Sequence, residues 1–215
     1  MAELKDKPKD FTLKDNTASK VIDIDPKKKI ELEIGDAKDV EFRPQFKVKK
    51  WDNEVNLSIR AQEDPTATVL VEGDIIKYKA TDYEVHHYED VDGFNFELVL
   101  LKKPISNSFV FTIQTKGLDF FPQPALTPEE IAEGAERPEN VIDSIAIYHS
   151  TKKNNIVGGM EYQAGKFGHL YRVEAINANG DKIYGTQVVD VNAGTLTKTV
   201  DDKWLSKAKY PVIIK

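Results

Sequence analysis

Apolar and polar residues alternate with a period of two along much of the first half of the chain. The pattern is clearest at residues 21–24, 30–34 and 56–60. Successive side chains of a β-strand point to opposite faces, so this period is typical of a strand with one buried face. Apolar content between turn-forming residues predicts further strands at residues 67–71, 75–80, 83–88, 94–101 and 109–114.

The last third of the chain has the same character. Asn179-Gly180 lies between two apolar alternating segments, and this dipeptide favours the tight turn of a β-hairpin. We therefore expect its flanking segments to pair antiparallel, with Ile176 and Ile183 near each other. Strands are predicted at residues 144–148, 169–176, 182–190, 196–200 and 211–214.

The composition changes between these two regions. Two prolines in the segment Phe120-Phe121-Pro122-Gln123-Pro124 disfavour both a helix and a central strand, which predicts an extended connector. Thr127-Pro128-Glu129-Glu130 then supplies an N-cap, a proline at the first helical position and a capping-box glutamate, and Gly134 is a natural terminator. A second short capped helix is predicted at residues 201–208.

Many short strands without long helices between them predict an all-β protein, an antiparallel β-sandwich of jelly-roll or Ig-like type with two short helices. We divide the chain into an N-terminal arm (1–20), a β-sandwich domain (21–118), a proline-rich connector with a short helix (119–140) and a second β module (141–215). In the alternative arrangement, the last part completes a single larger sandwich. The arm is rich in charge, so we expect it to be mobile or ordered by a partner.

Composition narrows the function classes. Of 215 residues, 40% are hydrophobic and 31% charged, which is typical of a globular protein. No apolar run approaches the roughly 20 residues of a membrane span, and the start lacks a secretory signal, so we expect no membrane contact and synthesis in a cytoplasm. The net charge is −6, which argues against nucleic acid. The one compact basic run, Pro26-Lys27-Lys28-Lys29, is explained by a turn.

The sequence contains no motif that predicts catalysis. The absence of cysteine excludes disulfides, thiolate metal sites and a cysteine nucleophile. Neither a G-x-S-x-G elbow nor a glycine-rich phosphate loop occurs. Asp90–Gly93 and Asn177–Asp181 imitate calcium loops but lack the closing glutamate, so both are interpreted as hairpin turns. We predict no catalytic residues and no cofactor.

The histidines are the remaining candidates for a metal site. His86 and His87 are adjacent in a predicted strand, so their side chains point to opposite faces and cannot share an ion. His149 and His169 could meet in space and bind a metal with Asp143 or Glu161, but no short-range ligand spacing supports this. We therefore predict no metal site and interpret these histidines as structural.

Several apolar side chains are candidates for binding a partner protein. Trp51 lies in a polar setting, and Phe120 and Phe121 lie beside a proline pair. Leu126 and Ile131 add apolar anchors in the segment that follows. Packing of the aromatic residues within the chain is the alternative.

Short segments after residue 120 occur in a distinctive order. They are LTPEEIAEGA at 126–135, RPENV at 137–141, GK followed by HLYR at 165–172, and WL, A and YPV between 204 and 212. Together they resemble a region of phage-like and metagenomic virion or surface structural proteins. Val173 departs from that pattern, in which proline often follows the H-x-Y-R core.

The resemblance implies a non-catalytic virion protein, such as a capsid-associated, decoration, head-fibre or tail component of a bacteriophage. Such a protein is made in the host cytoplasm and located in the virion. Its partners are other virion or surface structural proteins, as a homo-oligomer or within a larger assembly. Two other classes stay open: a carbohydrate- or cell-surface-binding β module, and a hydrolase with an unrecognised site.

Overall fold

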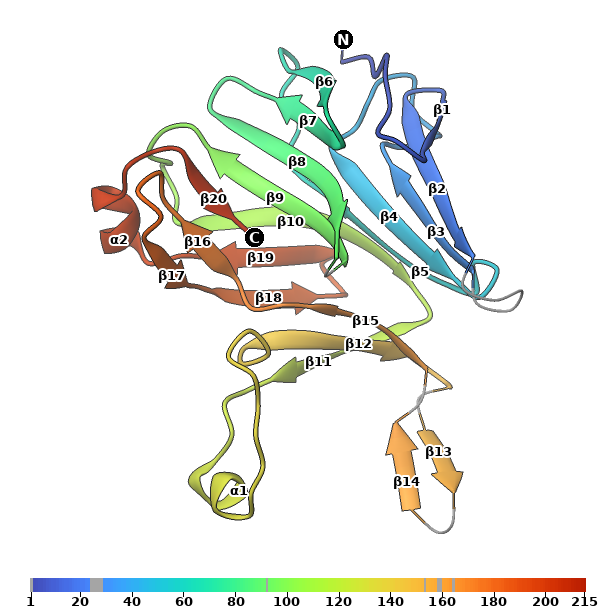
Figure 1. The fold of residues 1–215 in the computed structure, drawn as a ribbon, viewed down its shortest axis with the longest axis vertical. Helices are drawn as coiled ribbons and strands as arrows, with labels where there is room; N and C mark the ends of the chain where they lie inside the picture. Colours follow the sequence, from blue (N-terminus) through green and yellow to red (C-terminus); the bar gives the residue numbers. More distant parts are fainter. Residues whose placement is uncertain (1, 24–28, 92, 153, 158–159, 164) are drawn as a thin grey trace.

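Two large antiparallel sheets make up the body of the protein in the computed structural model, which describes residues 2–23, 29–91, 93–152, 154–157, 160–163 and 165–215 (Figure 1). The predicted turn at Pro26–Lys29 thus lies largely outside the described residues. The first sheet comprises, in spatial order, β1 (Thr12–Lys14), β2 (Thr17–Asp23), β3 (Lys29–Ile34), β4 (Gln45–Lys50), β5 (Val55–Arg60), β10 (Ser108–Lys116), β19 (Thr195–Thr199) and β18 (Thr186–Asp190).

The second sheet contains strands from both ends of the chain. Its spatial order is β17 (Lys182–Tyr184), β16 (Glu174–Ile176), β20 (Val212–Ile214), β9 (Gly93–Leu100), β8 (Tyr83–Asp90), β7 (Ile75–Lys79) and β6 (Thr68–Glu72). The prediction of an all-β fold with antiparallel sheets is confirmed. Because β19 pairs with β10 and β20 pairs with β9, residues before 119 and after 172 contribute strands to the same two sheets.

An aromatic cluster fills the space between the two sheets. Strand alternation sends Phe46 of β4 and Phe96 of β9 inward, and their ring centroids are 5.5 Å apart. Phe96 also packs edge-on against Phe111, at 5.5 Å, and against His87, at 5.0 Å. Burial of such rings contributes on the order of 2–3 kcal/mol each, so this cluster is a main source of cohesion between the sheets.

The N-terminal segment packs on the body, which differs from the predicted arm. The side chains of Ala2, Leu4 and Phe11 are buried. The backbone N–H of Phe42 donates to the carbonyl oxygen of Ala2 at 2.9 Å, and the N–H of Leu4 donates to Asn16 Oδ1 at 2.9 Å. A few well-spaced apolar residues therefore anchor the segment, while its charged residues stay in solvent.

The hairpin predicted at Asn179-Gly180 is confirmed. β16 and β17 pair antiparallel, with Ile183 opposite Ala175 and Lys182 opposite Ile176. Ile176 and Ile183 therefore lie on adjacent strands, but their side chains point to opposite faces of the sheet, which differs from the expected contact between them. Asn177 Oδ1 closes the turn, because it accepts the backbone N–H groups of Asn179 at 2.9 Å and Asp181 at 3.0 Å.

Two segments predicted as single strands are each divided. The strand expected at 182–190 is split at Gly185, where the chain crosses from the second sheet to the first. A Cβ at this glycine would lie 2.3 Å from the carbonyl oxygen of Thr199, so only glycine fits the crossing. The strand expected at 169–176 is likewise interrupted, and its two parts belong to different sheets.

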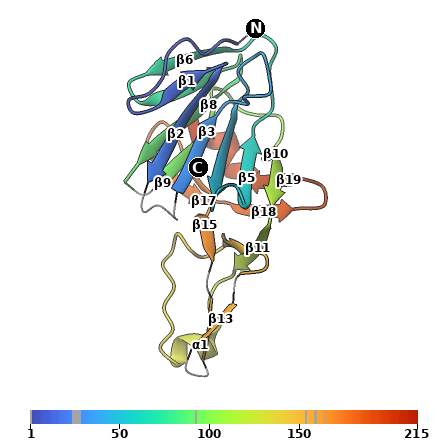
Figure 2. The same ribbon diagram turned by 90° about the vertical axis from the view of Figure 1, so that its right-hand side faces the viewer.

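A smaller sheet and two extensions form a lobe that projects from the sandwich (Figures 1 and 2). The sheet has the order β11 (Leu118–Gln123), β12 (Ser144–His149) and β15 (Lys166–Leu170). One extension, residues 124–143, contains α1 (Pro128–Ala132). The other is a hairpin of β13 (Asn154–Val157) and β14 (Met160–Gln163).

The segment predicted as an extended connector is largely the strand β11. Its residues Leu118–Gln123 pair with β12, and Pro122 lies opposite Ile145. Proline is tolerated here because β11 is an edge strand, which leaves one side of its backbone without a ladder partner. Pro122 therefore lies within an edge strand, and Pro124 follows directly after the strand ends.

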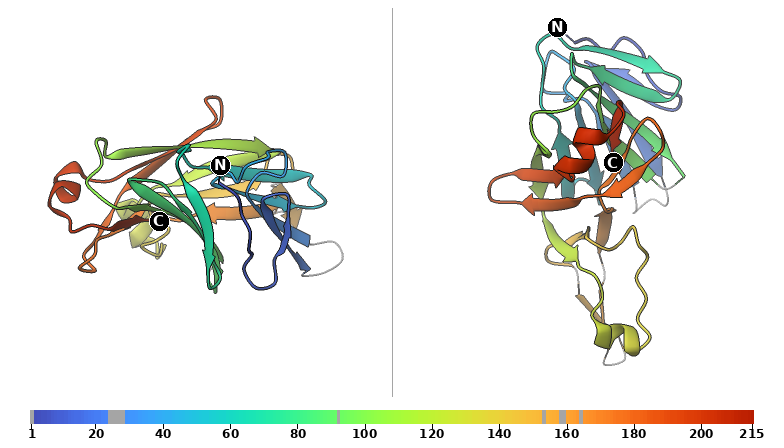
Figure 3. Two further views of the ribbon diagram at one scale, coloured as in Figure 1. Left: turned by 90° about the horizontal axis from the view of Figure 1, so that it is seen from above. Right: turned by 90° about the vertical axis from the view of Figure 1, so that its left-hand side faces the viewer.

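Both predicted helices are present and begin at the predicted caps. Thr127 forms a complete capping box with Glu130 at the start of α1. Asp201 caps α2 (Asp202–Lys207), whose Leu205 is buried. Figure 3 shows α2 against the side of the sandwich and α1 at the far tip of the lobe.

Candidate functional site

The base of the lobe is continuous with the core of the sandwich. β10 passes into β11 through Gly117, whose φ of +66° favours glycine and whose Cβ would lie 3.1 Å from Val55 Cγ1. Leu118, Ile147 and Phe167, one from each strand of the small sheet, are buried within the main core cluster. The lobe is therefore held at a fixed position on the body.

Trp51 lies at the junction between the body and the lobe. Its half-buried indole ring packs against His149 of β12, with ring centroids 5.7 Å apart. His149 Nδ1 accepts the backbone N–H groups of Thr151 at 3.1 Å and Lys152 at 3.2 Å, so the ring proton is on Nε2. Trp51 thus contacts its own chain, as the packing alternative expects.

Glu54 completes this junction. Its Oε1 lies 3.3 Å from His149 Nε2 and 2.5 Å from Lys152 Nζ. The hydrogen bond from Lys152, followed by the His149 ring, holds the pKa of the Glu54 carboxyl below its usual value. Both partners come from the lobe, so Glu54 connects the β4–β5 turn to the lobe.

Phe120 and Phe121 extend from opposite faces of β11. Phe120 is half-buried and packs against the core cluster. Phe121 is half-buried, and its ring lies edge-on to Tyr148, with centroids 5.8 Å apart. Both rings therefore make contacts within the chain.

Leu126 and Ile131 lie together at the tip of the lobe. They border a groove with a volume of about 510 Å³. Ile131 is 60% exposed, and no residue of α1 is buried. The groove is lined by Ala125, Leu126, Ile131, Ala135, Glu136, Arg137, Pro138 and Ile142.

The segment that forms this groove is rich in acidic residues, of which Glu136 lines the groove itself. The segment 124–143 contains six carboxylates and one arginine, which is a net −5 in a chain whose total is −6. The guanidinium of Arg137 donates to the carbonyl oxygen of Pro124 and so closes the base of the loop. We call the groove and the carboxylates of this segment the acidic groove.

A serine–histidine pair in the lobe was not predicted. Ser144 Oγ lies 2.5 Å from His169 Nε2 and 2.5 Å from the carbonyl oxygen of Val141. A carbonyl only accepts, so the serine hydroxyl donates to Val141 and the His169 N–H donates to serine. A nucleophilic serine needs the opposite polarity and an accessible oxygen, but Ser144 is 1% exposed. The pair instead fastens β15 to β12.

The structure does not bring the candidate metal ligands together. His169 Nε2 is engaged with Ser144, and His149 Nδ1 with backbone N–H groups. The side chain of Glu161 lies outside the described part of the chain. Within that part, no three histidine, aspartate or glutamate side chains gather in a metal-binding arrangement. His86 and His87 occupy opposite faces of β8, and His86 Nε2 lies 2.7 Å from Glu84 Oε2.

A search for membrane-spanning helices and three comparisons with known proteins complete the description. Neither helix in the described ranges has the length and apolarity to cross a membrane. Comparison of the chain with protein-family models, with curated proteins and with solved structures found no match in any of the three.

Proposed function

We propose that this chain is a non-catalytic structural component of a virion or related surface assembly, and that it docks on another structural protein through the acidic groove. The observation that carries this proposal is a lobe whose base is part of the core and whose tip exposes apolar side chains. Exposed apolar residues in a defined groove are typical of interaction sites.

Local hydrogen bonds order the groove without burying it. The capping box fixes the start of α1, where Thr127 Oγ1 accepts the N–H of Glu130 at 3.2 Å and Glu130 Oε2 accepts the N–H of Thr127 at 2.7 Å. Pro128 and Pro138 limit the backbone freedom of the segment. A groove that is ordered before binding loses less entropy on binding, which favours a docking role.

The chemistry of the groove indicates the kind of partner. Apolar residues at the centre with charged residues around them have the arrangement of a protein–protein interface. The net −5 of the segment repels nucleic acid and favours a protein surface with lysine or arginine around an apolar side chain.

The resemblance noted in the sequence supports an assembly role. Three of its segments, at residues 126–135, 137–141 and 165–172, fall within the lobe or at its end. The proposal therefore places the protein in the virion after synthesis in the host cytoplasm, with other structural proteins as partners.

Substitutions on the groove test this proposal. We expect Ile131→Ser, combined with Glu133→Lys and Glu136→Lys, to reduce incorporation of the protein into purified particles by at least about tenfold. Val40→Ser is the matched control, because Val40 is 86% exposed and lies on the body. Particles are quantified by mass spectrometry, and thermal unfolding confirms that both variants fold. Equal incorporation of the two variants would exclude the groove as the docking site.

A further inference from the structure

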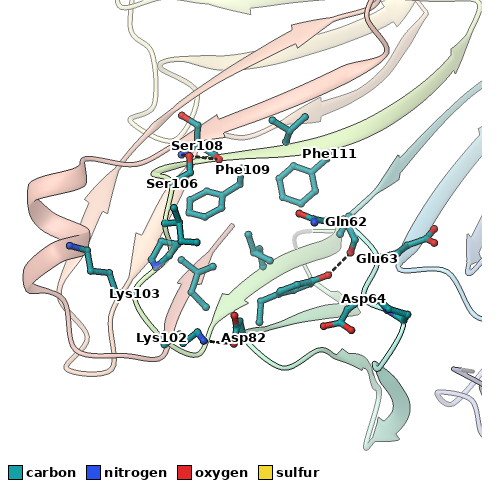
Figure 4. Close-up of a pocket in the computed structure, with 18 residues that line it drawn as sticks. Gln62, Glu63, Asp64, Asp82, Lys102, Lys103, Ser106, Ser108, Phe109 and Phe111 are labelled. Atoms are coloured by element: carbon teal, nitrogen blue, oxygen red, sulfur yellow. Dashed lines mark hydrogen bonds and ion pairs between the residues drawn. The ribbon is translucent and has the colours of Figure 1, made fainter.

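A second cavity lies at one end of the sandwich, outside the lobe. Its volume is about 790 Å³, within the range of small-molecule sites. The lining residues come from the chain after β5, from the β7–β8 turn and the start of β8, and from β9, β10 and the loop between them (Figure 4). The cavity therefore opens between the two sheets and uses only residues of the body.

The floor of this cavity is apolar and largely sealed. Leu98, Leu100 and Phe111 are 7%, 5% and 3% exposed, respectively. Phe109 is half-buried, and its ring points into the cavity (Figure 4). The Tyr83 hydroxyl donates to the carbonyl oxygen of Gln62 at 2.6 Å, which fixes a second ring beside the floor. The available apolar surface therefore combines the half-buried rings of Phe109 and Tyr83 with the exposed side chain of Ile105.

The rim is polar, and its carboxylates already have partners. Asp82 pairs with Lys102 at 2.6 Å. Glu63 pairs with Arg43 at 2.5 Å. Asp64 accepts hydrogen bonds from the backbone N–H and the hydroxyl of Thr66, at 2.8 and 2.7 Å. The rim thus presents fixed acceptors with little net charge available to attract an ion.

Uncharged and cationic donors complete the rim. The exposed side chains of Gln62, Lys103 and Ser106 line the cavity beside these carboxylates. The Gln62 amide both donates and accepts, and the ammonium of Lys103 donates. A bound molecule therefore meets donors and acceptors around an aromatic floor.

We propose that this cavity binds a neutral oligosaccharide. A sugar ring has an apolar C–H face, which fits an aromatic ring such as Phe109, and hydroxyl groups around its edge, which both donate and accept. An anionic ligand is disfavoured, because Lys102 is paired and three carboxylates line the rim. A cation is disfavoured because those carboxylates are already partnered, and a purely apolar ligand because it would leave rim groups desolvated without partners.

This site does not depend on the proposed docking function. The acidic groove belongs to residues 124–143, and none of the residues lining the cavity does. Loss of docking and loss of saccharide binding are therefore separable by substitution. If both sites operate, the body presents a glycan-binding end while the lobe is attached to the assembly.

The experiment uses the full chain and an array of immobilised neutral, sulfated and sialylated oligosaccharides. The strongest neutral binder is then titrated by calorimetry against the wild-type chain and two variants. We expect Phe109→Ala to weaken binding by at least about tenfold, because it removes the aromatic surface. We expect Gln62→Ala to weaken it about three- to tenfold, and this exposed residue can change without loss of the fold.

Ile131→Ser is the control and should bind the saccharide as the wild-type chain does, because it alters only the acidic groove. Binding of neutral saccharides that both cavity variants weaken supports the proposal. The proposal is overturned if no saccharide binds, if only the sulfated or sialylated ones bind, or if neither cavity substitution changes the affinity.

Discussion

His87 is the titratable residue most deeply placed in the core. It is 0% exposed, and both ring nitrogens lack a hydrogen-bond partner among the described residues. Its ring lies 5.0 Å from Phe96 and 6.4 Å from Phe42. Burial lowers the pKa of His87 from 6.5 to about 3, so the ring is neutral in the folded protein.

This lowered pKa predicts a loss of stability in acid. The unfolded chain binds a proton at His87 below about pH 6.5, whereas the folded chain does so only near pH 3, so stability falls as the pH drops between these values. At about pH 4.5, the protonation of His87 in the unfolded chain lowers the free energy of unfolding by roughly 2–3 kcal/mol relative to pH 7.5. In His87→Leu we expect this part of the acid sensitivity to vanish, as measured by urea unfolding at both pH values.

The adjacent residue provides the control. His86→Gln changes a half-buried residue on the opposite face of β8, and we expect it to retain the part of the acid sensitivity that His87 causes. If His87→Leu loses as much stability between the two pH values as the wild-type chain does, the claim that burial of a neutral His87 causes the acid sensitivity is refuted.

Phe120 and Ile131 belong to one lobe but have different environments. Phe120 packs against the core cluster, whereas Ile131 is 60% exposed. We expect Phe120→Ala to lower the free energy of unfolding by about 2–4 kcal/mol, and Ile131→Ser to change it by less than about 0.5 kcal/mol. Denaturant unfolding of the two variants checks this, and similar losses in both would contradict the assigned environments.

The sequence indicates which residues are apolar anchors but not where each one packs. Trp51 and Phe120 stood out as large aromatic residues beside polar or proline-rich segments, and both pack within the chain. Their neighbours, His149 and Ile147, come from a strand far along the sequence. Ser144 and His169 are 25 residues apart, and no local spacing signals their contact.

At the level of elements, the capping box of α1 gives a sharp local test. α1 buries no residue, so its order depends on the cap and on the loop around it. We expect Thr127→Ala to destabilise α1 by about 1 kcal/mol, seen as faster amide hydrogen exchange in residues 129–135. Exchange in β9 of the core should not change, and an unchanged rate in α1 would show that the cap is not what orders it.

Elements with local signals were predictable, and those set by distant contacts were not. Thr127 and Asp201 were predicted as caps, and Asn179-Gly180 as a turn, because the residues that determine these features are adjacent. β11 was predicted as a connector, since an edge position that tolerates Pro122 depends on the sheet. The break at Gly185 depends on the carbonyl of Thr199, which lies in another strand.

At the scale of the whole molecule, the two large sheets make the sandwich dependent on both ends of the chain. β10 has β19 as one neighbour, and β9 has β20. A chain of residues 1–118 would lack these neighbours and leave part of the aromatic core exposed. We expect this fragment to show no cooperative thermal unfolding, and a sharp transition would instead establish an independent first domain.

Charge is distributed unevenly between the two proposed sites. The net charge of residues 124–143, one extension of the lobe, is −5, in a chain whose total is −6. The cavity in the body has a nearly balanced rim. One end therefore suits a basic protein surface, and the other suits a neutral ligand.

The central claim is that the protein is a structural component of an assembled particle. Its most direct test is quantitative mass spectrometry of particles purified from cultures that express the gene, after washing in high salt to remove loosely bound protein. We predict that the chain is present at a fixed ratio to the major particle protein across independent preparations. Its absence from intact particles, or a ratio that falls towards zero with purification, would contradict the claim.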